Sequence, residues 1–84
     1  MFKGKLENTM IYKEVESLIS FAPLWRTIVE RGISQYQLIN QYGVSTGTLD
    51  SLRKNKSVTL NTVQDLCRIL NCSITDIVEI LPDE

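Results

Sequence analysis

The chain is 84 residues long, 43% hydrophobic and close to neutral, with a formal net charge of -1. This length fits one small domain, and no apolar run approaches the roughly 20 residues that cross a bilayer. With two cysteines and no histidine, a four-ligand zinc site and any Ser-His or Cys-His nucleophile pair are excluded. We therefore expect a cytoplasmic protein that is not an enzyme, does not bind a membrane, and needs no metal or cofactor.

The N-terminal part of the chain is the least regular. Residues 1 to about 8 are polar and mixed, and we expect residues 1–17 to form an arm that is partly disordered or takes part in dimerisation. Ile19–Phe21 fits either the end of a helical stripe or a short extended segment, because Pro23 disfavours the α region just before it. A helix should begin at about Ala22 or Pro23 and end at Gly32, a usual C-terminal signal. Its predicted apolar positions are Leu24, Trp25, Ile28 and Val29.

Two short helices joined by a tight turn are predicted next. Ser34 is the expected N-cap of the first, with Gln37 as its capping-box partner. That helix should bury Leu38, Ile39 and the ring of Tyr42, and Gly43 should end it. Ser45 should cap the second helix, with Leu49 and Leu52 pointing inward and Asn55 closing it in a left-handed conformation. This is the layout of a helix-turn-helix unit, whose second helix enters the major groove of DNA.

The last third of the chain predicts two further helices. Thr59 is the expected N-cap of the first, whose inward stripe is Leu60, Val63, Leu66, Cys67 and Leu70. Cys67 and Cys72 are expected to be reduced packing residues. Ser73 and Asp76 form a capping pattern before a final apolar run, Ile77, Val78, Ile80 and Leu81, which Pro82 ends.

The predicted fold is all-α, a compact bundle of four to five short helices with no strong strand signal outside the arm. We assign residues 1–17 to the arm, 18–81 to the helical domain and 82–84 to a tail.

Charge is unevenly distributed along the chain. Between Val44 and Val58 there is a single acid, Asp50, and the cations are Arg53, Lys54 and Lys56. Most acids lie outside this stretch. The end of the second helix of the unit therefore carries a thin basic rim, which favours contact with a phosphate backbone and strong salt sensitivity.

At this point the sequence resembles a known family. The stretch from Ile33 to Ser73, ISQYQLINQYGVSTGTLDSLRKNKSVTLNTVQDLCRILNCS, is similar to the helix-turn-helix domain of Cro and the phage repressors, the Xre-like family. The residues that carry the resemblance are Ser34, Gln35 and Leu38, then Gly43, Val44 and Ser45, then Leu49, Asn55 and Lys56, and finally Leu70 to Ser73. The resemblance extends from around Leu18 to around Leu81 and implies a lambda-repressor-like fold.

The resemblance also implies where DNA would be contacted. The helix at about residues 45–54 would lie in the major groove, and Lys54, Asn55 and Lys56 would meet the DNA backbone. Gln35 and the Tyr36 hydroxyl suit phosphates, and Ser or Thr hydroxyls suit base edges. The candidate DNA-binding residues are Gln35, Tyr36, Ser45, Thr46, Gly47, Thr48, Asp50, Ser51, Arg53, Lys54, Asn55 and Lys56. The chain departs from the family in its short recognition-helix side chains, and in Arg53, where Glu is frequent.

Two functions are compatible with this sequence. The first is a sequence-specific DNA-binding transcriptional regulator, a repressor, that binds double-stranded DNA as a homodimer. Pairing would raise the affinity of a domain with so few phosphate ligands. The alternative is a protein–protein interaction module or antitoxin-like adaptor on the same fold, with weak or no DNA binding. The net acidity and the short recognition-helix side chains favour the alternative.

Overall fold

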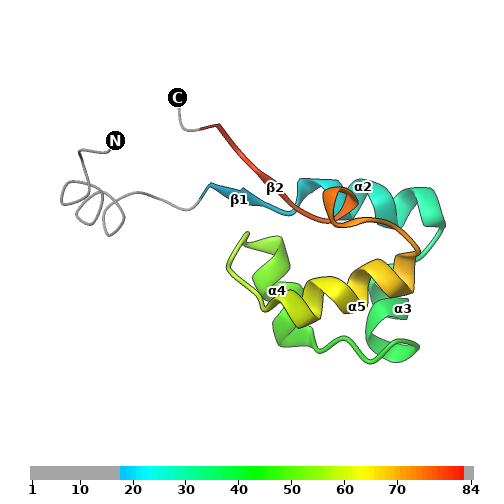
Figure 1. The fold of residues 1–84 in the computed structure, drawn as a ribbon. Coiled ribbons are helices and arrows are strands. Elements are labelled where there is room, and N and C mark those ends of the chain that lie inside the picture. The colour runs from blue at the N-terminus through cyan, green and yellow to red at the C-terminus, as the bar shows by residue number, and fades with distance from the viewer. Residues whose placement is uncertain (1–17, 83–84) are drawn as a thin grey trace, which may run out of the picture.

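The computed structural model describes residues 18–82, and the predicted arm at 1–17 lies outside these residues. Helices stack closely at one end of the described domain, and two short strands lie side by side at the other (Figure 1). In chain order the elements are β1 (Ile19–Ser20), α2 (Ala22–Arg31), α3 (Gln35–Asn40), α4 (Thr46–Arg53), α5 (Leu60–Leu70), the 3-10 helix η1 (Ile74–Asp76) and β2 (Glu79–Ile80).

Hydroxyl side chains define the starts of three helices. Ser34, Ser45 and Thr59 each accept a hydrogen bond from the backbone N–H three residues further on. Such a cap stabilises a helix by about 1 kcal/mol relative to alanine, because the first turn otherwise leaves its N–H groups unpaired. At Ser34 the Gln37 side chain also returns a bond to the Ser34 backbone N–H, at 2.9 Å. All three predicted caps are confirmed.

The helix ends depend on left-handed residues. Gly32 closes α2 with a φ of 70°, and Gly43 reverses the chain between α3 and α4 with a φ of 76°. Asn55 and Asn71 also adopt positive φ values, after α4 and α5. Glycine and asparagine tolerate this conformation best. The predicted roles of Gly32, Gly43 and Asn55 are confirmed.

The core is built mainly from leucines of all four α-helices. Its buried apolar residues are Phe21, Leu24, Ile28, Leu38, Leu49, Leu52, Val63, Leu66, Leu70 and Ile77. Trp25, Ile39 and both cysteines are half-buried against this core. The expectation that Cys67 and Cys72 are reduced packing residues is confirmed.

The large apolar residues Val29, Leu60 and Tyr42 are exposed, and two of them, Leu60 and Tyr42, are predicted to point inward. Val29 is 78% exposed, because the buried face of α2 continues from Leu24 through Thr27, whose hydroxyl donates to the Asp76 carbonyl at 2.8 Å. Leu60 is the first residue of α5 and is 77% exposed at the helix end. Tyr42 is also exposed, because α3 ends at Asn40 and leaves Tyr42 in the turn.

The predicted final helix is wrong beyond its first turn. Ser73 and Asp76 do form the expected capping box, but it heads only the three residues of η1. The chain then extends into β2, which pairs antiparallel with β1 in the register Ile19↔Ile80 and Ser20↔Glu79. The β-branched residues of this stretch fit a pleated strand well. The extended alternative for Ile19–Phe21 is therefore the correct one for Ile19 and Ser20.

Candidate nucleic-acid interface

The relative placement of α3 and α4 sets the interface. Leu38 of α3 and Leu49 and Leu52 of α4 are fully buried in the shared core. The turn between the helices is closed by the Val44 backbone N–H, which donates to the Leu38 carbonyl at 2.9 Å. With its leucines facing inward, α4 presents the opposite face to solvent. Thr46, Gly47, Asp50, Arg53 and Lys54 are exposed on that face.

Two of the candidate hydroxyls belong to the start of α4. Ser45 Oγ accepts from the Thr48 backbone N–H at 3.0 Å and donates to Thr48 Oγ1 at 2.9 Å. Thr48 is half-buried, as is Ser51. Thr48 and Ser51 are therefore less accessible than the exposed candidates. The exposed candidates for base contact are Ser45, Thr46, Gly47 and Asp50.

An ion pair crosses one turn of α4. Lys54 Nζ lies 3.1 Å from Asp50 Oδ2, and both side chains are more than half exposed. An exposed pair at this spacing adds little stability, about 0.3–0.5 kcal/mol. Lys54 also offsets the negative charge of Asp50 on this face of α4. Arg53 and Lys56 supply the remaining positive charge at this end of α4.

The side chains of Arg53 and Gln35 form a contact between α4 and α3. The guanidinium of Arg53 donates to Gln35 Oε1 from Nε at 3.0 Å and from Nη2 at 2.7 Å. Gln35 is the first residue of α3 and Arg53 the last of α4. Tyr36, the next residue of α3, is 74% exposed. The structure thus brings two predicted phosphate ligands into direct contact.

Asn55 connects the loop after α4 to the start of α2. Its Oδ1 accepts the backbone N–H of buried Phe21 at 2.8 Å. The next residue, Lys56, donates its backbone N–H to the Ser51 carbonyl at 2.8 Å, which folds the loop back onto α4. The side-chain oxygen of Asn55, a candidate DNA ligand in the sequence, thus accepts a hydrogen bond from the protein's own backbone.

Comparison with known proteins identifies this arrangement. The family model of the Cro/C1-type HTH DNA-binding domain matches residues 23–83, a span that includes every candidate residue. The chain belongs to the Cro/C1-type helix-turn-helix family. The crystal structure of the transcriptional regulator VanUg is similar to this Cro/C1-type domain, with a TM-score of 0.72 and 33% sequence identity, over 81% of this chain and 92% of that chain. A search among curated proteins finds no match.

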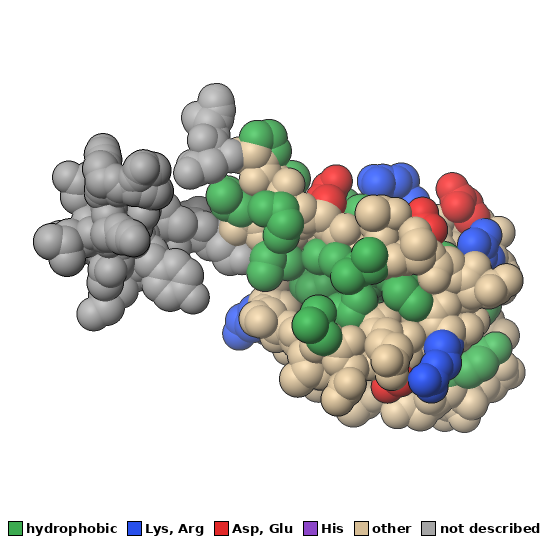
Figure 2. Space-filling view, viewed as in Figure 1, with side chains coloured by type: hydrophobic (Ala, Val, Ile, Leu, Met, Phe, Trp, Pro, Cys, Tyr) green, Lys and Arg blue, Asp and Glu red, His purple; other side chains and the backbone are tan. Residues whose placement is uncertain are grey.

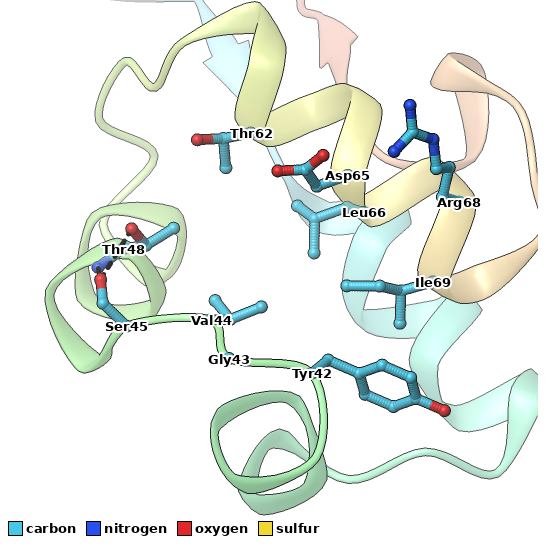
Figure 3. A pocket seen from close by; sticks show the side chains of 10 residues that line it. All are labelled: Tyr42, Gly43, Val44, Ser45, Thr48, Thr62, Asp65, Leu66, Arg68 and Ile69. Atoms are coloured by element: carbon cyan, nitrogen blue, oxygen red, sulfur yellow. Dashed lines mark hydrogen bonds between the residues drawn. The ribbon is translucent and has the colours of Figure 1, made fainter.

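The Cro/C1-type domain also has a groove that the sequence did not predict. It has a volume of about 440 Å³ and lies between the α3–α4 turn and α5 (Figure 3). Tyr42 and Ile69 stand at one end and Ser45 and Thr48 at the other. The remaining lining residues are Gly43, Val44, Thr62, Asp65, Leu66 and Arg68. The polar lining residues of α5, Thr62, Asp65 and Arg68, recur at intervals of three residues. In the sequence this spacing indicates a polar helix face, but it does not by itself indicate a groove.

The thiols of the Cro/C1-type domain have a packing role. Burial raises the pKa of the Cys72 thiol, and the nearby Cys67 raises it further. A thiol with a raised pKa is a poor nucleophile at neutral pH. Within residues 18–82 there is no group of three or more Cys, Asp or Glu side chains that could hold a metal ion. None of the helices in this range has the length and apolar character required to span a membrane.

The Asn55 contact predicts a graded series of stabilities. Asn55→Gly removes the acceptor for the Phe21 N–H and should lower the free energy of unfolding by about 1 kcal/mol. Asn55→Ala also forces alanine into the left-handed region, which costs about 1 kcal/mol more. Asn55→Asp retains the acceptor and serves as the control, with stability near wild type. Urea unfolding followed by circular dichroism measures the series, and equal stability of all four proteins would contradict a structural role for Asn55.

Proposed function

We propose that this chain is a sequence-specific transcriptional regulator, a repressor, that binds double-stranded DNA as a homodimer with α4 in the major groove. The observation that carries the proposal is the exposed polar face of α4, with exposed cationic side chains at its end and buried leucines behind it. A bound domain can repress by occupying its site, which requires no surface besides the interface and the dimer contact. Membership of a DNA-binding domain family and likeness to a transcriptional regulator support the proposal.

The candidate residues divide into two groups under this proposal. Thr46 and Asp50 read bases, the first through its methyl group on a thymine and the second through Oδ1, which can accept from a cytosine amine. Gly47 lets α4 approach the base edges closely. Ser45 and Thr48 form the N-terminal cap of α4, and half-buried Ser51 lies further along the helix. Gln35, Tyr36, Arg53, Lys54, Asn55 and Lys56 lie near the backbone and set the register.

The dimer surface that we propose is the exposed side of β2. Ile80 is 69% exposed and Leu81 43% exposed, whereas Ile77, from the same apolar run of the sequence, is fully buried and unable to contribute. Apolar side chains gather around the two strands and extend over the neighbouring face (Figure 2). Such a group is a candidate for burial against a second copy. Two copies would then present two α4 helices to two half-sites.

A charge reversal in the basic loop tests DNA binding. Selection from randomised duplex DNA should yield a sequence that the wild type binds with an affinity that falls steeply with salt. The double change Lys54→Glu, Lys56→Glu should weaken binding at least about tenfold and reduce the slope of log K against log salt by about 1.8, if both lysines contact phosphates. Arg26→Glu, a single charge reversal on the exposed side of α2, is a control for charge alone and should bind like wild type. No binding by the wild type at low salt would favour the adaptor function instead.

Base reading by Asp50 has its own signature. Asp50→Ala should abolish a cytosine preference at one position of the selected site, a discrimination of about 1–3 kcal/mol. The same change removes a negative charge and should slightly increase the affinity for random duplex DNA. Binding to a set of single-base variants of the selected site measures both effects. An unchanged preference profile would rule out base reading by Asp50.

The β2 surface can be tested without DNA. Ile80→Asp should convert a dimer to a monomer, measured by sedimentation equilibrium, because it places a charge in an apolar contact. Val29→Asp alters a similarly exposed apolar residue on α2 and should leave the oligomeric state unchanged. A dimer that survives Ile80→Asp would place the contact elsewhere.

A further inference from the structure

We propose that Arg53 is a positioning residue for DNA binding, which holds the Gln35 side chain so that the Gln35 amide Nε2 faces a DNA phosphate. In this view Arg53 acts through Gln35 and is not itself a phosphate ligand. The inference rests on the proposed function and assigns different roles to two residues that sequence analysis placed together. It is carried by the two hydrogen bonds from Arg53 to one oxygen of Gln35.

The chemistry of the pair fixes the orientation of the Gln35 amide. A guanidinium can only donate hydrogen bonds, so the amide atom that it contacts must be the oxygen. Both Nε and Nη2 of Arg53 converge on Oε1, at 3.0 and 2.7 Å. The two N–H donors of Nε2 are then directed away from Arg53. A freely rotating glutamine would present its oxygen to a phosphate as often as its nitrogen, and the oxygen would repel it.

The surroundings of the pair make this arrangement persistent. Gln35 is half-buried at the start of α3, while Arg53 is exposed. Along α4 the nearest acid, Asp50, is already paired with Lys54. Arg53 has no acidic partner among residues 18–82 and therefore remains with the neutral amide. The pair also links α3 and α4 from the solvent side, while Leu38 and Leu49 link them from inside.

Lysine and arginine are not equivalent at such a position. Lys carries the same charge as Arg but lacks the planar fork that reaches one acceptor from two nitrogens. Arg53→Lys therefore separates charge from positioning, and Arg53→Met removes both. Arg26→Lys is the matched control, because exposed Arg26 has no side-chain hydrogen bond or ion pair within the described residues.

The first experiment measures affinity for the selected duplex over a range of salt concentrations. Arg53→Lys and Arg53→Met should each weaken binding about tenfold or more, the effect of one lost hydrogen bond to a charged phosphate. The salt slope should be unchanged in both, and neither change should weaken binding further when Gln35 is replaced by Leu. The inference is overturned if Arg53→Lys binds like wild type while Arg53→Met loses affinity and about 0.9 of the slope, since Arg53 is then an ordinary phosphate ligand.

The second experiment uses the free protein, so it does not depend on DNA. Relaxation of the Gln35 side-chain amide, measured by ¹⁵N nuclear magnetic resonance, should show a rigid group in the wild type and in Arg26→Lys, and a mobile one in Arg53→Lys. Equal mobility in all three proteins overturns the inference and leaves the proposed function intact. Absence of binding by the wild type to any duplex at low salt overturns both together.

Discussion

The burial of Leu38, Leu49 and Leu52 against the remaining core is the interaction on which the structure depends. α3 has six residues and α4 has eight, and isolated helices shorter than about 12 residues are marginal in water. Neither helix would persist without its buried leucines and its N-cap. The exposed face of α4 is therefore a consequence of core packing: once the leucines turn inward, the register of the helix fixes which polar residues meet solvent.

Polar contacts between distant segments then fix the ends of the elements. Arg31 donates to the carbonyls of Leu70 and Asn71 at 2.6 and 3.1 Å, which joins the end of α2 to the end of α5. Thr27 joins α2 to η1, and Asn55 joins the loop after α4 to the start of α2. Each contact satisfies a backbone group that would otherwise lack a partner at a helix end or in a loop. Together they link α2, α5, η1 and the loop after α4, and under the proposed function such links would lower the ordering cost of binding DNA.

The predictable part of this structure is the local part. The caps at Ser34, Ser45 and Thr59 and the turn at Gly43 depend on residues within three or four positions, so the sequence alone indicates them. The pairing of β1 with β2 joins the two ends of the domain, and no local pattern carries that information. The same holds for the Arg53–Gln35 contact. The Asp50–Lys54 pair, in contrast, can be predicted from the sequence, because an acid and a base four residues apart lie on the same face of a helix.

The charge arrangement explains how a chain with a net charge of -1 can present a surface suited to a polyanion. Lys54 compensates Asp50 within one turn, so the acid on the exposed face of α4 contributes little net field. Arg53 is held by a neutral amide and keeps its full charge, and Lys56 follows in the loop. The local field is thus positive but small. With short side chains on α4, a domain of this kind would gain discrimination chiefly from the shape of DNA and from the spacing of two copies.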